Sequence, residues 1–145
     1  MSSESIPEYK IILASNSSIR KKILEDSGIA FEVVPSEVEE EELKQSLSGN
    51  NFREYCLTLA KAKALDVSNK KKNAYVIGSD QICCYGEEIF SKPLTKENCF
   101  KTLSKLSGNT HYQNCGISIC KNGKEIWSHY AQAALTMKSL SDREI

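Results

Sequence analysis

The fold of this chain is decided by residues 74–93, AYVIGSDQICCYGEEIFSKP. The first four residues of this stretch, Ala74–Ile77, are apolar and predict a buried strand. We expect this strand to end at Gly78 and Ser79 and to present Asp80 where it opens onto a cleft. A carboxylate at such a place is a candidate for catalysis, although acidic residues also end many strands that have no functional role.

The second half of the stretch predicts a short hairpin. Residues 82–85 and 89–90 are β-prone, and residues 86–88 form the turn between them. The return strand carries Lys92, and Pro93 then ends the hydrogen-bonded ladder because proline has no amide proton. Asp80 and Lys92 are therefore expected at the same end of the hairpin. An acid beside an ammonium suits phosphoryl chemistry, while a solvated edge lysine is the alternative.

The composition is that of an ordinary soluble globular protein. The chain has 145 residues, 40% of them hydrophobic and 26% charged, which is enough for one domain with a core. Its 19 basic and 19 acidic residues balance, which argues against a broad nucleic-acid-binding surface. No run has the length of a membrane span and no signal peptide is recognisable, so we expect a cytoplasmic protein without membrane association. The scattered cysteines predict reduced thiols, and their spacing does not favour a zinc site.

A candidate anion site follows the first predicted strand. Residues 10–14, KIILA, have strand character, and residues 19–28 have helical spacing that ends at a glycine. Ser15, Ser17 and Arg20 then lie around a helix N-terminus, where unpaired amides and the helix dipole favour a phosphate. The alternative is that the serines only cap the helix and Arg20 is a surface charge.

Two further segments predict charged groups near a cleft. Residues 29–35 predict a second strand, and the acidic run 36–42 follows it. One inward-facing carboxylate of that run is enough to ligate a hard cation, and a solvated loop is the alternative. Residues 51–67 predict a helix in which Lys63 continues an apolar stripe. Such a lysine either extends to water at the helix end or meets an anion in a cleft.

The remaining segments are predicted to be scaffold. Residues 94–108 predict a helix that Thr95 caps and a glycine ends. Its buried stripe is expected to comprise Cys99, Phe100, Leu103 and Leu106. Residues 110–120 and 124–137 predict two strands joined at Asn122-Gly123, a strong hairpin signal. The last six residues start a capping box, which suggests the front part of a longer domain.

The segments LASNSSIR, VVPSEVEE, LAKAKA, VIGSDQ, SKPLTKEN and LSGN, in this order and spacing, resemble the Maf family of nucleoside triphosphate pyrophosphatases. The resemblance covers nearly all of residues 11–145. It implies an α/β fold like that of the inosine-triphosphate pyrophosphatases, an elongated mixed β-sheet with flanking helices and two lobes around a nucleotide cleft. It also implies Mg²⁺- or Mn²⁺-dependent hydrolysis of a nucleoside triphosphate to its monophosphate and pyrophosphate, and a homodimer.

The resemblance further implies a role for each candidate residue. Asp80 would be the general base and, with Glu40, a metal ligand, and Lys92 would act in catalysis. The implied phosphate-binding residues are Ser15, Ser17, Arg20, Lys63 and Lys92. Ile19 and Gln81 occupy specificity positions: Ile19 replaces the arginine or tryptophan that is usual in the family, and Gln81 resembles the branch acting on 7-methyl-GTP. The family's C-terminal third has no counterpart here, so residues 1–145 are expected to form a single Maf-like domain that is incomplete at its C-terminus.

Two other functions are compatible with this sequence. The chain would act as a nucleotide-binding regulator of cell division if it binds nucleotide without turnover. It would be a non-functional remnant if it neither binds nucleotide nor unfolds cooperatively.

Overall fold

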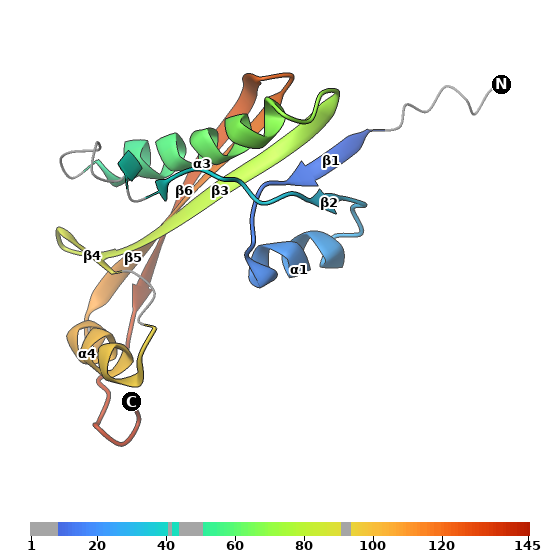
Figure 1. Cartoon of the computed structure of the whole chain (residues 1–145). Helices are drawn as coiled ribbons and strands as arrows, with labels where there is room; N and C mark the ends of the chain where they lie inside the picture. Colours follow the sequence, from blue (N-terminus) through green and yellow to red (C-terminus); the bar gives the residue numbers. More distant parts are fainter. Residues whose placement is uncertain (1–8, 41, 44–50, 91–93) are drawn as a thin grey trace.

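The computed structural model describes residues 9–40, 42–43, 51–90 and 94–145 (Figure 1). Within these residues the elements are, in chain order, β1 Lys10–Leu13, α1 Ser18–Asp26, β2 Glu32–Val33, α3 Phe52–Ser68, β3 Ala74–Tyr85, β4 Glu88–Phe90, α4 Lys96–Leu106, β5 Thr110–Lys121 and β6 Lys124–Thr136. Six strands of the described chain form one mixed sheet in the order β2-β1-β3-β5-β6, with β4 beside β3. The predicted α/β fold, an elongated mixed sheet with flanking helices, is confirmed.

The order of the first three strands creates a switch point between β1 and β3. Strand β1 pairs in parallel with β2 on one side and with β3 on the other. The connection through α1 therefore crosses the sheet in one direction and the connection through α3 in the other. Because such crossovers are right-handed, the two helices lie on opposite faces of the sheet, as Figure 1 shows. Ligands of α/β sheets bind beyond the carboxyl ends of the strands at such a point.

Strand β3 is longer than the sequence predicts. The expected end at Gly78 and Ser79 is wrong, because β3 continues to Tyr85 and pairs with β5 from Val76 to Cys84. On its other side β3 pairs with β1 only as far as Ile77 and with β4 only from Cys83. In the described part of the chain, residues 78–82 therefore have a strand on one side only, and Asp80 lies in the middle of this open edge.

Helix α3 lies directly on β3 and β5. A Cβ atom on Gly78 would lie 2.3 Å from the backbone oxygen of Ala60, and one on Gly116 would lie 2.6 Å from the backbone carbon of Cys56. The buried residues of the helix are Cys56, Leu59, Ala60, Lys63, Ala64, Val67 and Ser68. Small residues on both partners bring the helix backbone close to the sheet, and the hydrophobic core forms between them.

The hairpin signals of the second half are confirmed. Strands β5 and β6 meet at Asn122 and Gly123, whose φ angles of 52° and 77° are those of a tight two-residue turn. Trp127 of β6 is 49% exposed, although it lies within a strand. Strand β4 starts at Glu88, so the first hairpin turns at residues 86–87 and not at 86–88.

Two predictions about burial and length are wrong. The expected strand over residues 29–35 is reduced to Glu32–Val33. Helix α4 forms with Thr95 as its N-cap, but of its predicted buried stripe only Leu106 is buried, and Phe100 is 42% exposed. The apolar stripe predicts the helix correctly, but it does not indicate that the described part of the chain covers little of the helix surface.

Three sequence expectations about the rest of the chain can be compared with the structure. The six cysteines, all of them in described residues, are free thiols as predicted. Near the last described residue, the Glu144 carboxylate accepts a hydrogen bond from the Ser141 amide at 3.1 Å, which is one half of the expected capping box. No helix in the described ranges has both the length and the apolar character needed to span a membrane.

Candidate active site

A buried lysine and two carboxylates form the centre of the site. The Lys63 ammonium lies 3.2 Å from Asp80 Oδ1 and 2.5 Å from Glu40 Oε1, and it donates to the Ser79 carbonyl oxygen at 3.3 Å. Lys63 and Asp80 are each only 8% exposed. Of the two alternatives for Lys63, the structure therefore shows the one in which it points inward and meets an anion.

The position of Lys63 follows from the packing of α3 on the sheet. Ala60 and Ala64 lie against Gly78. Lys63, which precedes Ala64 on the helix, therefore projects over the open edge of β3. Asp80 is two residues after Gly78 on the same face of the strand. The close contact of helix and strand is therefore what brings the ammonium to the carboxylate.

Burial raises the pKa of Asp80. Desolvation raises the pKa of this carboxyl above its usual value, while the Lys63 ammonium opposes the rise, Glu40 adds to it and Arg20 opposes it. Asp80 Oδ2 is buried and has no hydrogen-bond partner within the described residues. A carboxylate with a raised pKa is a stronger base than one on the surface, and an unpartnered oxygen is available to a water or a cation.

Glu40 reaches the site because its segment is tied to α3. After β2, the Val34 amide donates to the Leu13 carbonyl oxygen at 3.0 Å, and the Glu37 amide donates to Asp66 Oδ2 of α3 at 2.8 Å. The Leu43 amide then closes a helical turn on the Glu39 carbonyl oxygen. The acidic run thus places one carboxylate inward, as the sequence suggested, while Glu37 and Glu39 are exposed.

The serine-rich turn lies at the N-terminus of α1. Ser17 is the N-cap and its Oγ accepts from the Arg20 amide at 3.3 Å. Ser15, which is buried, accepts from the Ser17 amide at 3.0 Å and from Arg20 Nη1 at 3.4 Å. The Ala14 amide donates to the Ile77 carbonyl oxygen, so this turn is attached to β3 just before Asp80. Ser17 therefore caps the helix. The serine-rich turn also lies at the switch point of the sheet, where an anion could bind.

The other predicted site residues lie apart from this centre or outside the described chain. Ile19 is 71% exposed on α1. Gln81 is exposed, points to the sheet face opposite Asp80, and donates to Gln113 Oε1 at 2.9 Å. Lys92 lies outside the described residues, so its expected position beside Asp80 stays a prediction.

The donor set at Asp80 and Glu40 fits a hard divalent cation. No three His, Cys, Asp or Glu side chains of the described residues gather around one point. Mg²⁺ does not need such a cluster, because it binds through one or two carboxylates together with waters and substrate phosphates. The carboxylates of Glu40 and Asp80, the latter with its unpartnered Oδ2, provide ligands of this kind.

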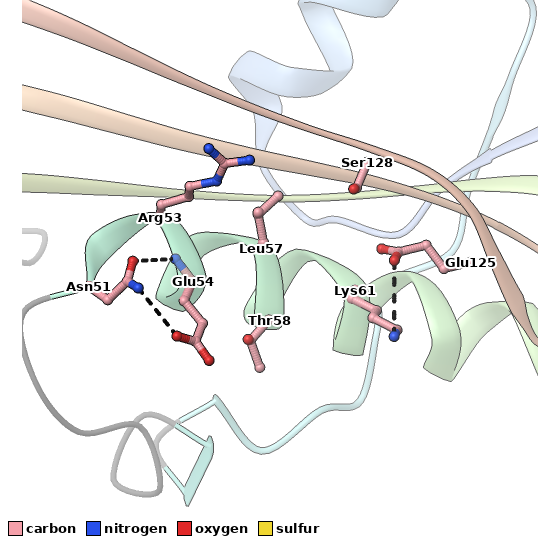
Figure 2. Close-up of a pocket in the computed structure, with 8 residues that line it drawn as sticks. All are labelled: Asn51, Arg53, Glu54, Leu57, Thr58, Lys61, Glu125 and Ser128. Carbon is pink, nitrogen blue, oxygen red and sulfur yellow. Dashed lines mark hydrogen bonds and ion pairs between the residues drawn. The ribbon is translucent and has the colours of Figure 1, made fainter.

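A separate hollow of about 360 Å³ lies between α3 and β6 (Figure 2). Figure 2 shows the residues that line it, which are Asn51, Arg53, Glu54, Leu57, Thr58 and Lys61 of the helix segment and Glu125 and Ser128 of β6. The polar groups pair within the hollow, as Asn51 does with Glu54 and Lys61 with Glu125 at 4.0 Å. None of the predicted site residues within the described ranges lines it.

Sequence reasoning missed the residues that position the site. Gly78 was interpreted as a strand end, whereas it marks the contact with α3, and an isolated glycine in a strand does signal such an approach. Asp66, which holds the segment before Glu40, gave no signal, because its partner is 29 positions earlier in the chain.

Comparison with known proteins supports the fold and gives the family. The HAM1 protein of Coxiella burnetii superposes with a TM-score of 0.52 at 13% identity, over 88% of this chain and 71% of that chain, which is a likeness of fold. A nucleoside triphosphate pyrophosphatase of Legionella pneumophila (strain Corby) is 39% identical over 143 residues, which are 99% of this chain and 72% of the relative. A 7-methyl-GTP pyrophosphatase of Mesorhizobium japonicum is 41% identical over 133 residues, which are 90% of this chain and 67% of the relative.

The fold and site thus define an α/β protein with a charged centre at the switch point of its sheet. Residues 10–145 match the family described as Maf-like protein. The chain belongs to the Maf family, as the motifs of its sequence predict.

Proposed function

We propose that this chain hydrolyses a nucleoside triphosphate to its monophosphate and pyrophosphate. The observation that carries the proposal is the buried Asp80, which faces Lys63 and Glu40 at the open edge of β3, beside the serine-rich turn of α1. Relatives that are 39–41% identical to this chain over the aligned residues are named as pyrophosphatases of nucleoside triphosphates or of 7-methyl-GTP.

In this proposal Asp80 is the general base and the cationic groups bind the phosphates. Asp80 accepts a proton from a water whose oxygen attacks the α-phosphorus, and the bond from that phosphorus to the bridging oxygen of the β-phosphate breaks. Lys63 and Arg20 stabilise negative charge on the phosphates, and the α1 N-terminus offers its amides and Ser15 as donors. The raised pKa of Asp80 favours its role as the base.

Asp80 and Glu40 are the residues that would hold Mg²⁺ or Mn²⁺. When bound, such a cation supplies charge neutralisation for the phosphates and lowers the pKa of a water. The finer parts of the proposal are a 7-methyl-GTP-like substrate read at Gln81 and Ile19, a contribution of Lys92, a homodimer and a cytoplasmic location. The first three of these parts follow from the family resemblance, and the cytoplasmic location is the expectation from the sequence.

The test is pyrophosphate release from a panel of nucleoside triphosphates, including 7-methyl-GTP, with Mg²⁺. We expect release from at least one of them, and a loss of about 100-fold or more in kcat on Asp80→Asn, since positioned general bases contribute this much. Asp142→Asn is the matched control, because Asp142 is exposed and lies near the C-terminal end.

The contrary outcomes are distinct from one another. Equal release from Asp80→Asn and the unchanged chain would refute the role of Asp80. Nucleotide binding by calorimetry without product over hours would replace hydrolysis by the regulatory function. Absence of binding, together with a poorly cooperative thermal transition, would indicate a remnant.

A further inference from the structure

The Lys63 ammonium lies between the two carboxylates that fit a divalent cation. Within the described residues its acceptors are Glu40 Oε1, Asp80 Oδ1 and the Ser79 carbonyl oxygen, at 2.5, 3.2 and 3.3 Å. Carboxylate and carbonyl oxygens are also the ligands that hard cations prefer. The ammonium and a divalent cation therefore compete for the same oxygens.

Two facts keep the ammonium in this place. Lys63 is 8% exposed, so its stem is enclosed by the packing of α3 on the sheet. The two carboxylates are close enough for Glu40 to raise the pKa of Asp80, and the ammonium offsets this repulsion. Among the described residues, Lys63 is the cation that pairs with both carboxylates, so removing its ammonium would leave their mutual repulsion without this partner.

We propose that Lys63 is a positioning residue that holds Glu40 and Asp80 together and excludes a divalent cation until a triphosphate draws its ammonium away. This inference rests on the proposed function. A triphosphate brings new oxygen acceptors for the ammonium. A triphosphate bound at the α1 N-terminus would lie beside Asp80, because the Ala14 amide before this helix donates to the Ile77 carbonyl oxygen of β3. Lys63 thereby makes metal binding conditional on nucleotide binding.

The experiment measures Mn²⁺ binding without nucleotide, from the electron paramagnetic resonance signal of free Mn²⁺. Lys63→Gln removes the ammonium, and we expect it to bind Mn²⁺ at least about tenfold more tightly than the unchanged chain, since hydrogen bonds to charged groups contribute about 1.5–3 kcal/mol and 1.4 kcal/mol is tenfold. Lys63→Arg keeps a cation and should bind as weakly as the unchanged chain. Lys61→Gln is the matched control, because Lys61 lies on the same helix, is exposed and pairs with Glu125.

Equal Mn²⁺ affinity of Lys63→Gln and the unchanged chain would overturn the proposal, as would tight binding by Lys63→Arg. If Lys63→Gln is poorly folded, the thermal transition replaces the titration: Mn²⁺ should raise the Tm of this variant more than that of the unchanged chain, and an equal rise contradicts exclusion by Lys63. Because no nucleotide is added, this experiment is independent of pyrophosphate release. If the unchanged chain releases pyrophosphate but Lys63→Gln binds Mn²⁺ weakly, the proposed function stands and the role of Lys63 in excluding the cation is refuted.

Discussion

Helix α4 has the more clearly amphipathic sequence, yet α3 is the helix that the fold buries. In α4 the only buried residue is Leu106. In α3 the buried residues extend from Cys56 to Ser68 and include a lysine. An apolar stripe predicts which side of a helix faces protein, but it does not tell how much protein lies there. The burial of α3 comes instead from the small residues that let two backbones approach.

The largest effect that tests this comparison is expected from Gly78→Ala. The added Cβ would lie 2.3 Å from the Ala60 carbonyl oxygen and 2.8 Å from the Ala64 amide nitrogen, both of them backbone atoms that cannot turn away. We expect a loss of about 3 kcal/mol in the free energy of unfolding, at the upper end for overpacked cores, measured by urea denaturation. Pyrophosphate release should fall as well, because α3 carries Lys63.

Gly86→Ala is the control for this variant. A Cβ on Gly86 meets no atom within 4 Å, so the only cost of this substitution is the strain of an alanine at a φ of 61°. That cost is about 1–2 kcal/mol. If Gly78→Ala is no more costly than Gly86→Ala, the close approach of α3 and β3 is not what holds the core together.

The comparison also explains how much of the fold could be predicted. Local signals were sufficient for the caps Ser17 and Thr95, for α3, and for the turn at Asn122 and Gly123. The length of β3 could not be predicted in this way. Its residues 78–82 form a strand because β5 pairs with them, and β5 lies more than 30 positions later in the chain.

The contacts of Lys63 agree with the sequence better than the bounds of β3 do, while the roles of the site residues stay predictions. Lys63 was identified because a lysine in an apolar stripe is unusual, and its partners Asp80 and Glu40 are confirmed as neighbours. The expected position of Asp80 at the end of a strand is wrong, since Asp80 lies within β3. The edge there is open because β1 stops pairing at Ile77 and β4 starts at Cys83, which is a tertiary fact with no local signal.

A smaller effect is expected from Asn114→Ala. This variant tests whether polar contacts add to the stability of the sheet face that α3 covers. Asn114 is fully buried and donates to the Ile82 carbonyl oxygen at 3.2 Å, while its Oδ1 accepts from Gln132 at 2.9 Å and from Tyr130. Its loss removes a partner from the buried Ile82 carbonyl and from the half-buried Tyr130 hydroxyl, and we expect about 2 kcal/mol less stability in urea denaturation.

Tyr130→Phe is the matched control, since it removes only one of these hydrogen bonds. We expect it to cost about 1 kcal/mol. A cost for Asn114→Ala no greater than that of Tyr130→Phe would mean that water satisfies the groups around Asn114, and that the side of the sheet under α3 is less closed than the burial of its residues indicates.

The smallest effect is expected on α4, from Phe100→Ala. Phe100 is 42% exposed, so truncation removes only part of the contact area of a buried phenylalanine, and we expect a cost of less than about 1 kcal/mol. Leu59→Ala on α3 is the matched measurement, with about 3 kcal/mol expected for a leucine with no exposed surface. Equal costs for the two variants would mean that another surface covers α4 in solution. A cost for Phe100→Ala that rises with protein concentration would identify that surface as a second copy of the chain, because only then is stability linked to association.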